Sequence, residues 1–212
     1  MLRNLEEVYF PESLQDVVAK RAEYGDAAAP IAGGTDIVPQ APPGIKCLID
    51  LNRLGLNYIH EEDGKIHIGA TTTMQELSAS ALVAGMASGI LNSSCCQGWP
   101  RQVRNAATIG GNLVSAGPFA DTPPALLALD ATAVIVDQRG ETEIPLDEFF
   151  LDYRQTAVGS GILKEIVLPA TQRQCRGVFL RFARTEIDTA LVNAAVSIQF
   201  DGSKCSHVRI AL

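Results

Sequence analysis

Two glycine pairs constrain this chain more than any other feature of its sequence. Gly33 and Gly34 follow a short apolar segment, and Gly110 and Gly111 follow another. Because glycine has no side chain, such a segment can bring its backbone close to an anion and direct several N–H groups at it. Two such segments in one small chain predict an extended ligand with a diphosphate as its anionic part. A tight turn, in which a glycine only supplies a positive φ, is the alternative interpretation.

Polar residues accompany both glycine pairs. A Thr-Asp sequence that can cap a short helix follows the first pair, and Thr108, Asn112 and Ser115 surround the second. Their hydroxyl and amide groups can hydrogen-bond to the polar groups of a ligand. Neither segment contains GxGxxG or GxxxxGK[ST], so the sequence does not support a Rossmann or P-loop nucleotide site.

The spacing of apolar residues predicts helices in four places. The first begins after an N-cap at Ser13, carries Leu14, Val17, Val18 and Arg21 at helical spacing, and ends at Gly25. The others are a helix capped by Thr72 or Thr73, a buried helix over residues 81–96 with an interruption near Gly89, and a helix from Asp121-Thr-Pro-Pro to about Leu129. Residues 105–118, between the last two, are interpreted as a glycine-punctuated loop.

Short apolar segments predict strands over the remaining chain. The expected strands are residues 28–32, 47–51, 57–60, 65–69, 133–137, 142–145, 162–169, 178–183, 190–200 and 207–212. Residues 61–64 and Asp201-Gly202 are expected to form hairpin turns. Residues 169–175 are the best candidate for a domain boundary.

Composition excludes several classes of partner. The formal net charge of -7 repels a phosphate backbone, so nucleic acid is not an expected partner. Glu6 and Glu7 interrupt any signal-peptide pattern, and no apolar run reaches membrane-spanning length, so we expect a cytoplasmic protein that does not insert into a membrane. The five cysteines show no CxxC spacing and the three histidines no partner pattern, so neither a metal site nor a catalytic residue is predicted.

Three motifs in order resemble a known family. They are AGGTD at residues 32–36, RNAATIGGN at residues 104–112 and PFADTPPALLALDA at residues 118–131. Together they resemble the FAD-binding, or medium, subunit of molybdenum hydroxylases, the xanthine dehydrogenase and carbon monoxide dehydrogenase flavoprotein family. The similarity extends over about residues 1–200.

The resemblance implies an α+β fold in two parts. Residues 1–172 would form a two-lobed FAD-binding domain of the vanillyl-alcohol-oxidase (PCMH-like) type, with lobes at about residues 1–56 and 57–172. Residues 173–212 would begin an α/β C-terminal domain, which we expect to be truncated because family members usually continue past the position of Leu212.

The resemblance also implies which residues bind FAD. The pyrophosphate would be enclosed by both glycine segments, Asp121 would contact the polar groups of the cofactor, and Ile162 and Leu180 would lie near the flavin. The full set is Ala29, Pro30, Ile31, Ala32, Gly33, Gly34, Thr35, Asp36, Ala107, Thr108, Ile109, Gly110, Gly111, Asn112, Asp121, Ile162 and Leu180. The sequence itself leaves a second interpretation open for Asp121, the N-cap of the helix over residues 122–129.

In this family, electrons come from a molybdopterin subunit through an iron–sulfur subunit to FAD, which passes them to NAD or another acceptor. The chain is therefore expected to be a flavin subunit with no metal site of its own. Two alternatives stay open: a structural subunit without flavin, and a self-contained flavin oxidase.

Overall fold

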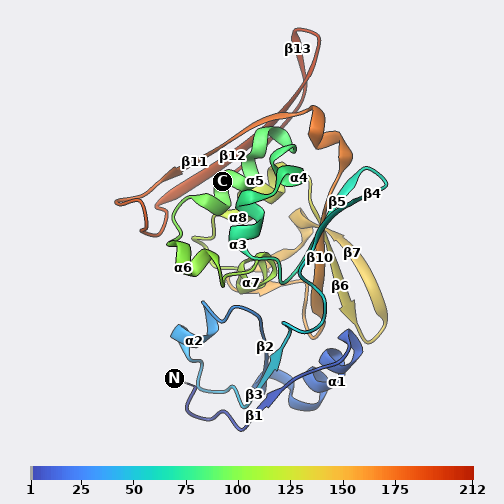
Figure 1. Ribbon diagram of the computed structural model, residues 1–212, viewed down its shortest axis with the longest axis vertical. Helices are drawn as coiled ribbons and strands as arrows, with labels where there is room; N and C mark the ends of the chain where they lie inside the picture. The colour runs from blue at the N-terminus through green and yellow to red at the C-terminus, as the bar shows by residue number, and fades with distance from the viewer. Residues whose placement is uncertain (1) are drawn as a thin grey trace.

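The computed structural model describes residues 2–212 and contains three main sheets that succeed one another along the molecule (Figure 1). The N-terminal lobe holds the first sheet, the central lobe holds the second sheet and most of the helices, and the third sheet lies at the opposite end. A mixed helix and strand fold was expected, and it is confirmed. No helix among residues 2–212 has both the length and the apolar character needed to cross a membrane.

The N-terminal lobe is a three-stranded parallel sheet with a helix beside it. Its elements are β1 (Glu7–Tyr9), α1 (Leu14–Tyr24), the 3₁₀ turn η1 (Gly25–Ala27), β2 (Ala28–Ile31), α2 (Ile37–Gln40) and β3 (Cys47–Asp50). Both β1 and β2 pair with β3 in parallel. Ser13 and Asp16 form the capping box that begins α1, as the sequence predicts for Ser13, and Val17 and Val18 bury the apolar face of the helix.

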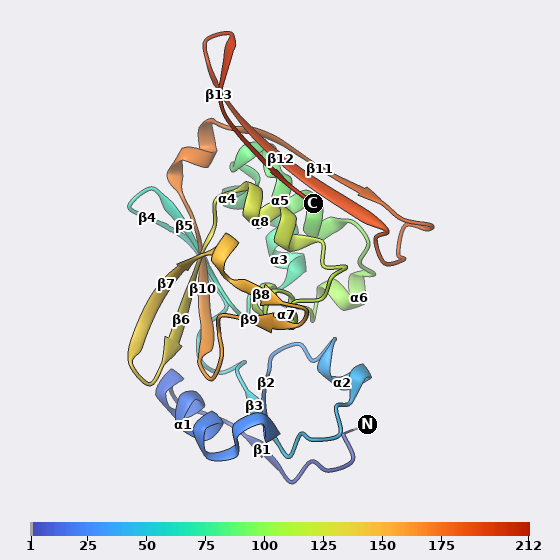
Figure 2. The same ribbon diagram turned by 180° about the vertical axis from the view of Figure 1, so that it is seen from behind.

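The central lobe is built on a five-stranded antiparallel sheet of order β4-β5-β10-β6-β7. The strands are β4 (Ile59–Glu62), β5 (Lys65–Gly69), β6 (Thr132–Asp137), β7 (Gly140–Pro145) and β10 (Ile162–Leu168), and the short pair β8 (Phe150–Asp152) and β9 (Gln155–Thr156) precedes β10. Strand β10 is central and almost wholly buried, since helices cover one face of this sheet (Figure 2). The turn between β4 and β5 is Asp63-Gly64, both with positive φ, so the predicted turn at residues 61–64 is two residues too long.

Short helices cover the sheet of the central lobe. They are α3 (Met74–Ala79), α4 (Ala81–Ala84), η2 (Ala87–Gly89), α5 (Ile90–Cys96), α6 (Arg101–Arg104), α7 (Ile109–Ser115) and α8 (Thr122–Ala128), with η3 (Leu146–Glu148) after β7. Thr73 caps α3 in a capping box with Glu76. Residues 81–96 are helical with the expected interruption, which lies at η2. The predicted loop at residues 105–118 is wrong in its middle, because α7 occupies half of it.

The third sheet follows the turn η4 (Ala170–Gln174). Its antiparallel strands are β11 (Arg176–Phe182), β12 (Val192–Asp201) and β13 (Lys204–Ala211). Phe179 and Ala195 face inward, and α8 packs against β12 and β13. Leu180, Phe182 and Ile210 are exposed on the opposite face of the sheet.

Candidate functional site

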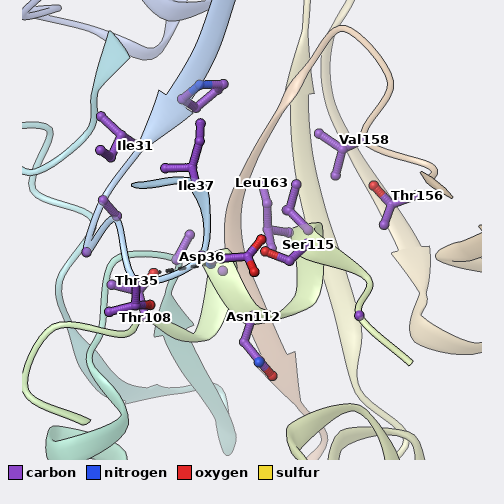
Figure 3. Close-up of a pocket in the computed structure, with 18 of the residues that line it drawn as sticks. Ile31, Thr35, Asp36, Ile37, Thr108, Asn112, Ser115, Thr156, Val158 and Leu163 are labelled. Atoms are coloured by element: carbon purple, nitrogen blue, oxygen red, sulfur yellow. Dashed lines mark hydrogen bonds between the residues drawn. The ribbon is translucent and has the colours of Figure 1, made fainter. Parts of the chain in front are cut away.

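A cavity of about 960 Å³ lies between the N-terminal and central lobes. Its volume is at the upper end of the range of about 300–1,000 Å³ that is usual for small-molecule sites. The segment between β2 and α2 forms one wall, α7 forms the opposite wall, and β9 and the start of β10 close one side (Figure 3). Residues from both lobes therefore line one cavity that is partly open to solvent.

The first glycine segment offers a run of free backbone donors to this cavity. Among the described residues, the N–H groups of residues 32–36 donate no hydrogen bond to the rest of the chain, and all five residues line the cavity. Gly34 has φ of 67°, so the positive-φ interpretation of this glycine pair holds for Gly34. Consecutive unpaired N–H groups in a glycine turn are a typical binding site for an anion.

The second glycine segment differs from the sequence interpretation. Gly110 and Gly111 lie in the first turn of α7, which Thr108 caps through its side chain. The N–H groups of residues 109–112 are all used: they donate to Thr72 O, Ala70 O, Thr108 Oγ1 and Thr108 O. This segment therefore contributes a closely packed wall and side chains rather than free backbone donors.

Three side chains of α7 and its cap supply polar groups to the cavity. Thr108, Asn112 and Ser115 all line it. The Thr122 hydroxyl donates to Asn112 Oδ1 at 2.5 Å, and no partner within residues 2–212 accepts from the Asn112 amide nitrogen. That nitrogen is a donor available to a ligand.

Two of the glycines are required by packing between backbone segments. A β carbon on Gly33 would lie 1.7 Å from the Ala106 carbonyl oxygen, and one on Gly110 would lie 2.6 Å from the Ala70 carbonyl oxygen. Gly33 belongs to the N-terminal lobe and Ala106 to the central lobe. Gly33 thus allows the two walls of the cavity to meet, and Gly110 allows close packing within the central lobe. The sequence interpretation had considered only ligand approach and a tight turn.

Thirteen of the seventeen predicted site residues line the cavity. The other four are Ala29, Ile109, Asp121 and Leu180. Ala29 and Ile109 are buried in the adjoining core, and Leu180 is 63% exposed on the outer face of the third sheet. Cofactor contact by these four stays a prediction without support from their positions.

Asp121 belongs to a buried network that connects the central lobe with the third sheet. Its carboxylate accepts from Arg181 Nε at 3.1 Å and from Asn193 Nδ2 at 2.7 Å. Burial raises the pKa of Asp121, while Asn193 and Arg181 act in the opposite direction. Its side chain makes no capping hydrogen bond to α8, so the predicted N-cap role is wrong: the carboxylate is turned toward β11 and β12 instead.

The sequence interpretation missed several residues that line the cavity. Apolar contacts come from Val158 and Leu163, and aromatic side chains from Trp99 and Phe119. Two arginines, Arg21 and Arg154, also line it. Arg21 had a signal in the sequence, because it shares the apolar face of α1 with Val17 and Val18.

Arg154 connects the two lobes at the rim of the cavity. Its Nη1 donates to Gln40 Oε1 at 2.7 Å and lies 3.9 Å from Asp36 Oδ2. Gln40 Nε2 in turn donates to Asp36. The three side chains join α2 and its N-cap to the turn between β8 and β9.

Among residues 2–212, no group of three or more His, Cys, Asp and Glu side chains is arranged to hold a metal ion. His60 and His67 stack on neighbouring strands with ring centroids 5.2 Å apart, and His67 Nδ1 lies 3.3 Å from Glu165 Oε2. None of these three residues lines the cavity.

Comparison with known proteins identifies relatives over nearly the whole chain. A family described as the FAD binding domain in molybdopterin dehydrogenase matches residues 3–171. The chain is 32% identical to the 6-hydroxypseudooxynicotine dehydrogenase complex subunit alpha of Paenarthrobacter nicotinovorans, over 95% of this chain and 70% of the relative. It is also 32% identical to the carbon monoxide dehydrogenase medium chain of Hydrogenophaga pseudoflava, over 97% of this chain and 73% of the relative.

Solved structures give the same result. Carbon monoxide dehydrogenase from Hydrogenophaga pseudoflava superposes with a TM-score of 0.92 at 30% identity, covering 99% of this chain and 75% of that chain. Quinoline 2-oxidoreductase from Pseudomonas putida 86 superposes with a TM-score of 0.88 at 27% identity, covering 99% of this chain and 74% of that chain.

Proposed function

The chain belongs to the family of FAD-binding domains of molybdopterin dehydrogenases, and we propose that it binds FAD in the cavity between its lobes and relays electrons there. The observation that carries the location of the site is the run of free N–H groups at residues 32–36 on the cavity wall. These are five consecutive N–H groups that include Gly33 and Gly34, and FAD contains a diphosphate that needs such donors.

The residues present fit FAD in three respects. Residues of both lobes, including Val103 on α6 of the central lobe, line the cavity, and its volume suits a dinucleotide. Residues 32–36 offer donors for the pyrophosphate, and Asn112 and Ser115 offer polar groups across the cavity. Ile31, Val158 and Leu163 provide apolar surface for ring systems. When bound, FAD supplies reversible redox chemistry, to which the protein adds position and electrostatics.

Each wall has its own task in this proposal. The N-terminal lobe binds the pyrophosphate through the N–H groups of residues 32–36. The central lobe orients the cofactor through Thr108, Asn112 and Ser115, and the contact between Gly33 and Ala106 fixes the distance between the walls. Arg154, Gln40 and Asp36 connect the lobes at the rim.

We further propose that electrons reach this site from an iron–sulfur subunit, which receives them from a molybdopterin subunit, and leave it for NAD or another acceptor. The names of the relatives support an assembly, because they describe a complex subunit alpha and a medium chain. A flavin-free structural subunit and a self-contained flavin oxidase are the competing functions.

Cofactor analysis of the purified chain tests the binding proposal. Denaturation should release about one FAD per chain, identified by chromatography against FMN and riboflavin standards. Elemental analysis should find no stoichiometric iron, zinc or molybdenum. Absence of flavin, after incubation of the apo-protein with FAD as well, would support the structural-subunit alternative.

Purification from the native cell tests the relay proposal. The chain should copurify with polypeptides that carry iron and molybdenum, and substrate of that complex should reduce the flavin only when they are present. Reoxidation of the reduced flavin by NAD, compared with oxygen and artificial acceptors, tests the acceptor. An isolated chain that oxidises an organic substrate alone would favour the oxidase alternative.

A further inference from the structure

Arg21 lines one end of the cavity, and no residue within 2–212 accepts a hydrogen bond from its Nη2. Its Nη1 donates to the Gly161 carbonyl just before β10, whereas its Nε is buried without a partner among the described residues. No carboxylate within residues 2–212 lies within salt-bridge distance of its guanidinium, although Asp26 is near enough to exert a favourable field. Because Nε has almost no accessible surface, Nη2 is the nitrogen left to donate to a molecule in the cavity.

The position of Arg21 on α1 is also unusual. It follows Val17 and Val18 on the face that packs toward the central lobe, where a leucine or another apolar residue would suit the core. Burial lowers the pKa of Arg21, because it disfavours the charged form of the guanidinium. A charged side chain placed at such a cost, on the wall of a cavity, indicates binding.

The two ends of the cavity differ in access. At the end that Arg21 lines, the lobes share a core in which Ile162 and Val136 pack with Val17 and Val18. Ile162 is only 5% exposed, whereas Phe119, which lines the cavity near α6 and the third sheet, is 62% exposed. The two regions lie apart in both views of the fold (Figures 1 and 2).

Electron exchange with an outside partner requires the flavin ring at the accessible end. The adenosine half of the cofactor then extends toward the closed end, past the donors of residues 32–36. Adenosine carries acceptors on its purine ring and ribose, and a guanidinium can donate to them while its plane stacks on the ring.

We propose that Arg21 binds the adenosine half of FAD, with its Nη2 as the donor and its Nη1 contact to Gly161 fixing the guanidinium plane. This inference rests on the proposed FAD function and adds a specificity residue to it: Arg21 makes the site selective for the dinucleotide over flavin mononucleotide.

Binding measurements with three probes test this role. Apo-protein of the parent and of Arg21→Leu is titrated with FAD, ADP and FMN by calorimetry or flavin fluorescence. In Arg21→Leu, affinity for FAD and for ADP should each fall about tenfold or more, the value of one lost hydrogen bond from a charged donor, while FMN affinity changes less than about twofold. Equal losses for FAD and FMN, or no loss for FAD, would overturn the proposal.

Controls separate binding from structure. Leucine suits the apolar face of α1, so the apo-protein of Arg21→Leu should melt at or above the temperature of the parent. Arg21→Lys keeps the charge and can reach the Gly161 carbonyl but lacks a second nitrogen that could donate to the ligand, so it should not recover FAD affinity. Full recovery would show that Arg21 acts only by binding the Gly161 carbonyl. Arg139→Leu removes one positive charge from the exposed turn between β6 and β7 and should leave all three affinities unchanged.

The outcome for the parent protein separates this inference from the function on which it rests. A parent chain that binds neither FAD nor ADP contradicts the proposed function itself. A parent that binds FAD while Arg21→Leu binds it equally well contradicts only the role of Arg21.

Discussion

Gly33 and Ala106 approach each other so closely that a β carbon on Gly33 would lie 1.7 Å from the Ala106 carbonyl oxygen. The neighbour is backbone, so the clash of an added methyl group can be relieved only by moving the two lobes apart. Gly33→Ala is therefore expected to destabilise the protein by about 1–3 kcal/mol, as overpacking of a rigid site does, and to weaken FAD binding at the displaced wall. Urea unfolding and FAD titration measure the two effects.

A matched glycine in the same lobe serves as the control for Gly33→Ala. Gly44 has nothing within 4 Å of an added β carbon. Gly44→Ala should leave FAD affinity unchanged. It should raise the free energy of unfolding by no more than about 0.4–1 kcal/mol. Equal behaviour of the two variants would show that the contact between Gly33 and Ala106 does not set the distance between the lobes.

Gly110 and Gly111 are adjacent, yet they should respond differently to alanine. At Gly110 a β carbon meets the Ala70 carbonyl oxygen at 2.6 Å, whereas at Gly111 it meets only the Thr108 hydroxyl at 2.9 Å. Gly110→Ala should thus lower stability strongly. In Gly111→Ala the loss of the Thr108 cap, about 1 kcal/mol, is offset by the helix propensity of alanine, about 1 kcal/mol.

FAD binding provides a second test of Gly111 on α7. Because Gly111 lines the cavity, Gly111→Val should obstruct the cofactor while the apo-protein stays folded. Circular dichroism confirms the fold and flavin fluorescence reports binding. If Gly111→Val binds FAD as tightly as the parent does, the pyrophosphate does not pass α7 and only the segment at residues 32–36 encloses it.

The sequence predicted the features that depend on neighbouring residues. The cap at Ser13, the hairpin turn at Gly64 and the break near Gly89 follow from local backbone chemistry, and they were expected. Helix α7 was missed because two glycines lower helix propensity by about 1 kcal/mol each. The carbonyl oxygens of Ala70 and Thr72, distant in sequence, accept from its first turn and offset that loss.

Asp121 shows that a site residue, too, is hard to predict from the sequence when its partners are distant in the chain. Asp121 comes shortly before two prolines, a pattern typical of an N-cap. No residue near it in the sequence indicates that Arg181 and Asn193 are its partners. The buried network appears only when β11 and β12 pack on the central lobe. Arg21 is the opposite case, since a charged residue at helical spacing with Val17 and Val18 could have been recognised as a site residue.

The ion pair of Asp121 and Arg181 should contribute more to the free energy of unfolding than a helix cap does. Both side chains are 5% exposed, so Arg181→Met leaves a buried carboxylate without its partner and should cost about 3–5 kcal/mol. Asp121→Asn combined with Arg181→Met should cost less than Arg181→Met alone, which a double-mutant cycle measures. Asp121→Ser can cap α8 but cannot pair with Arg181; parent-like stability of this variant would restore the capping role.

The last prediction concerns acid stability of the N-terminal lobe. Glu7 on β1 accepts from Lys20 Nζ at 3.1 Å and from the Tyr24 hydroxyl at 3.0 Å, both on α1. These contacts, Lys20 first and Tyr24 second, lower the pKa of Glu7 below its ordinary value of 4.5. A carboxyl whose pKa is lower in the folded state stabilises the protein above the unfolded pKa, and this stabilisation is lost as the pH falls through the folded pKa.

Glu7→Gln isolates that contribution, because glutamine keeps the size of the side chain and cannot titrate. We expect the parent to exceed Glu7→Gln in the free energy of unfolding at about pH 6, and the difference to shrink steadily as the pH falls below 4.5 toward about 3. Urea unfolding at a series of pH values measures both proteins. Parallel curves over this range would mean that Glu7 has the same pKa in the folded and unfolded chain, and that its contacts with α1 add nothing to the stability of the lobe.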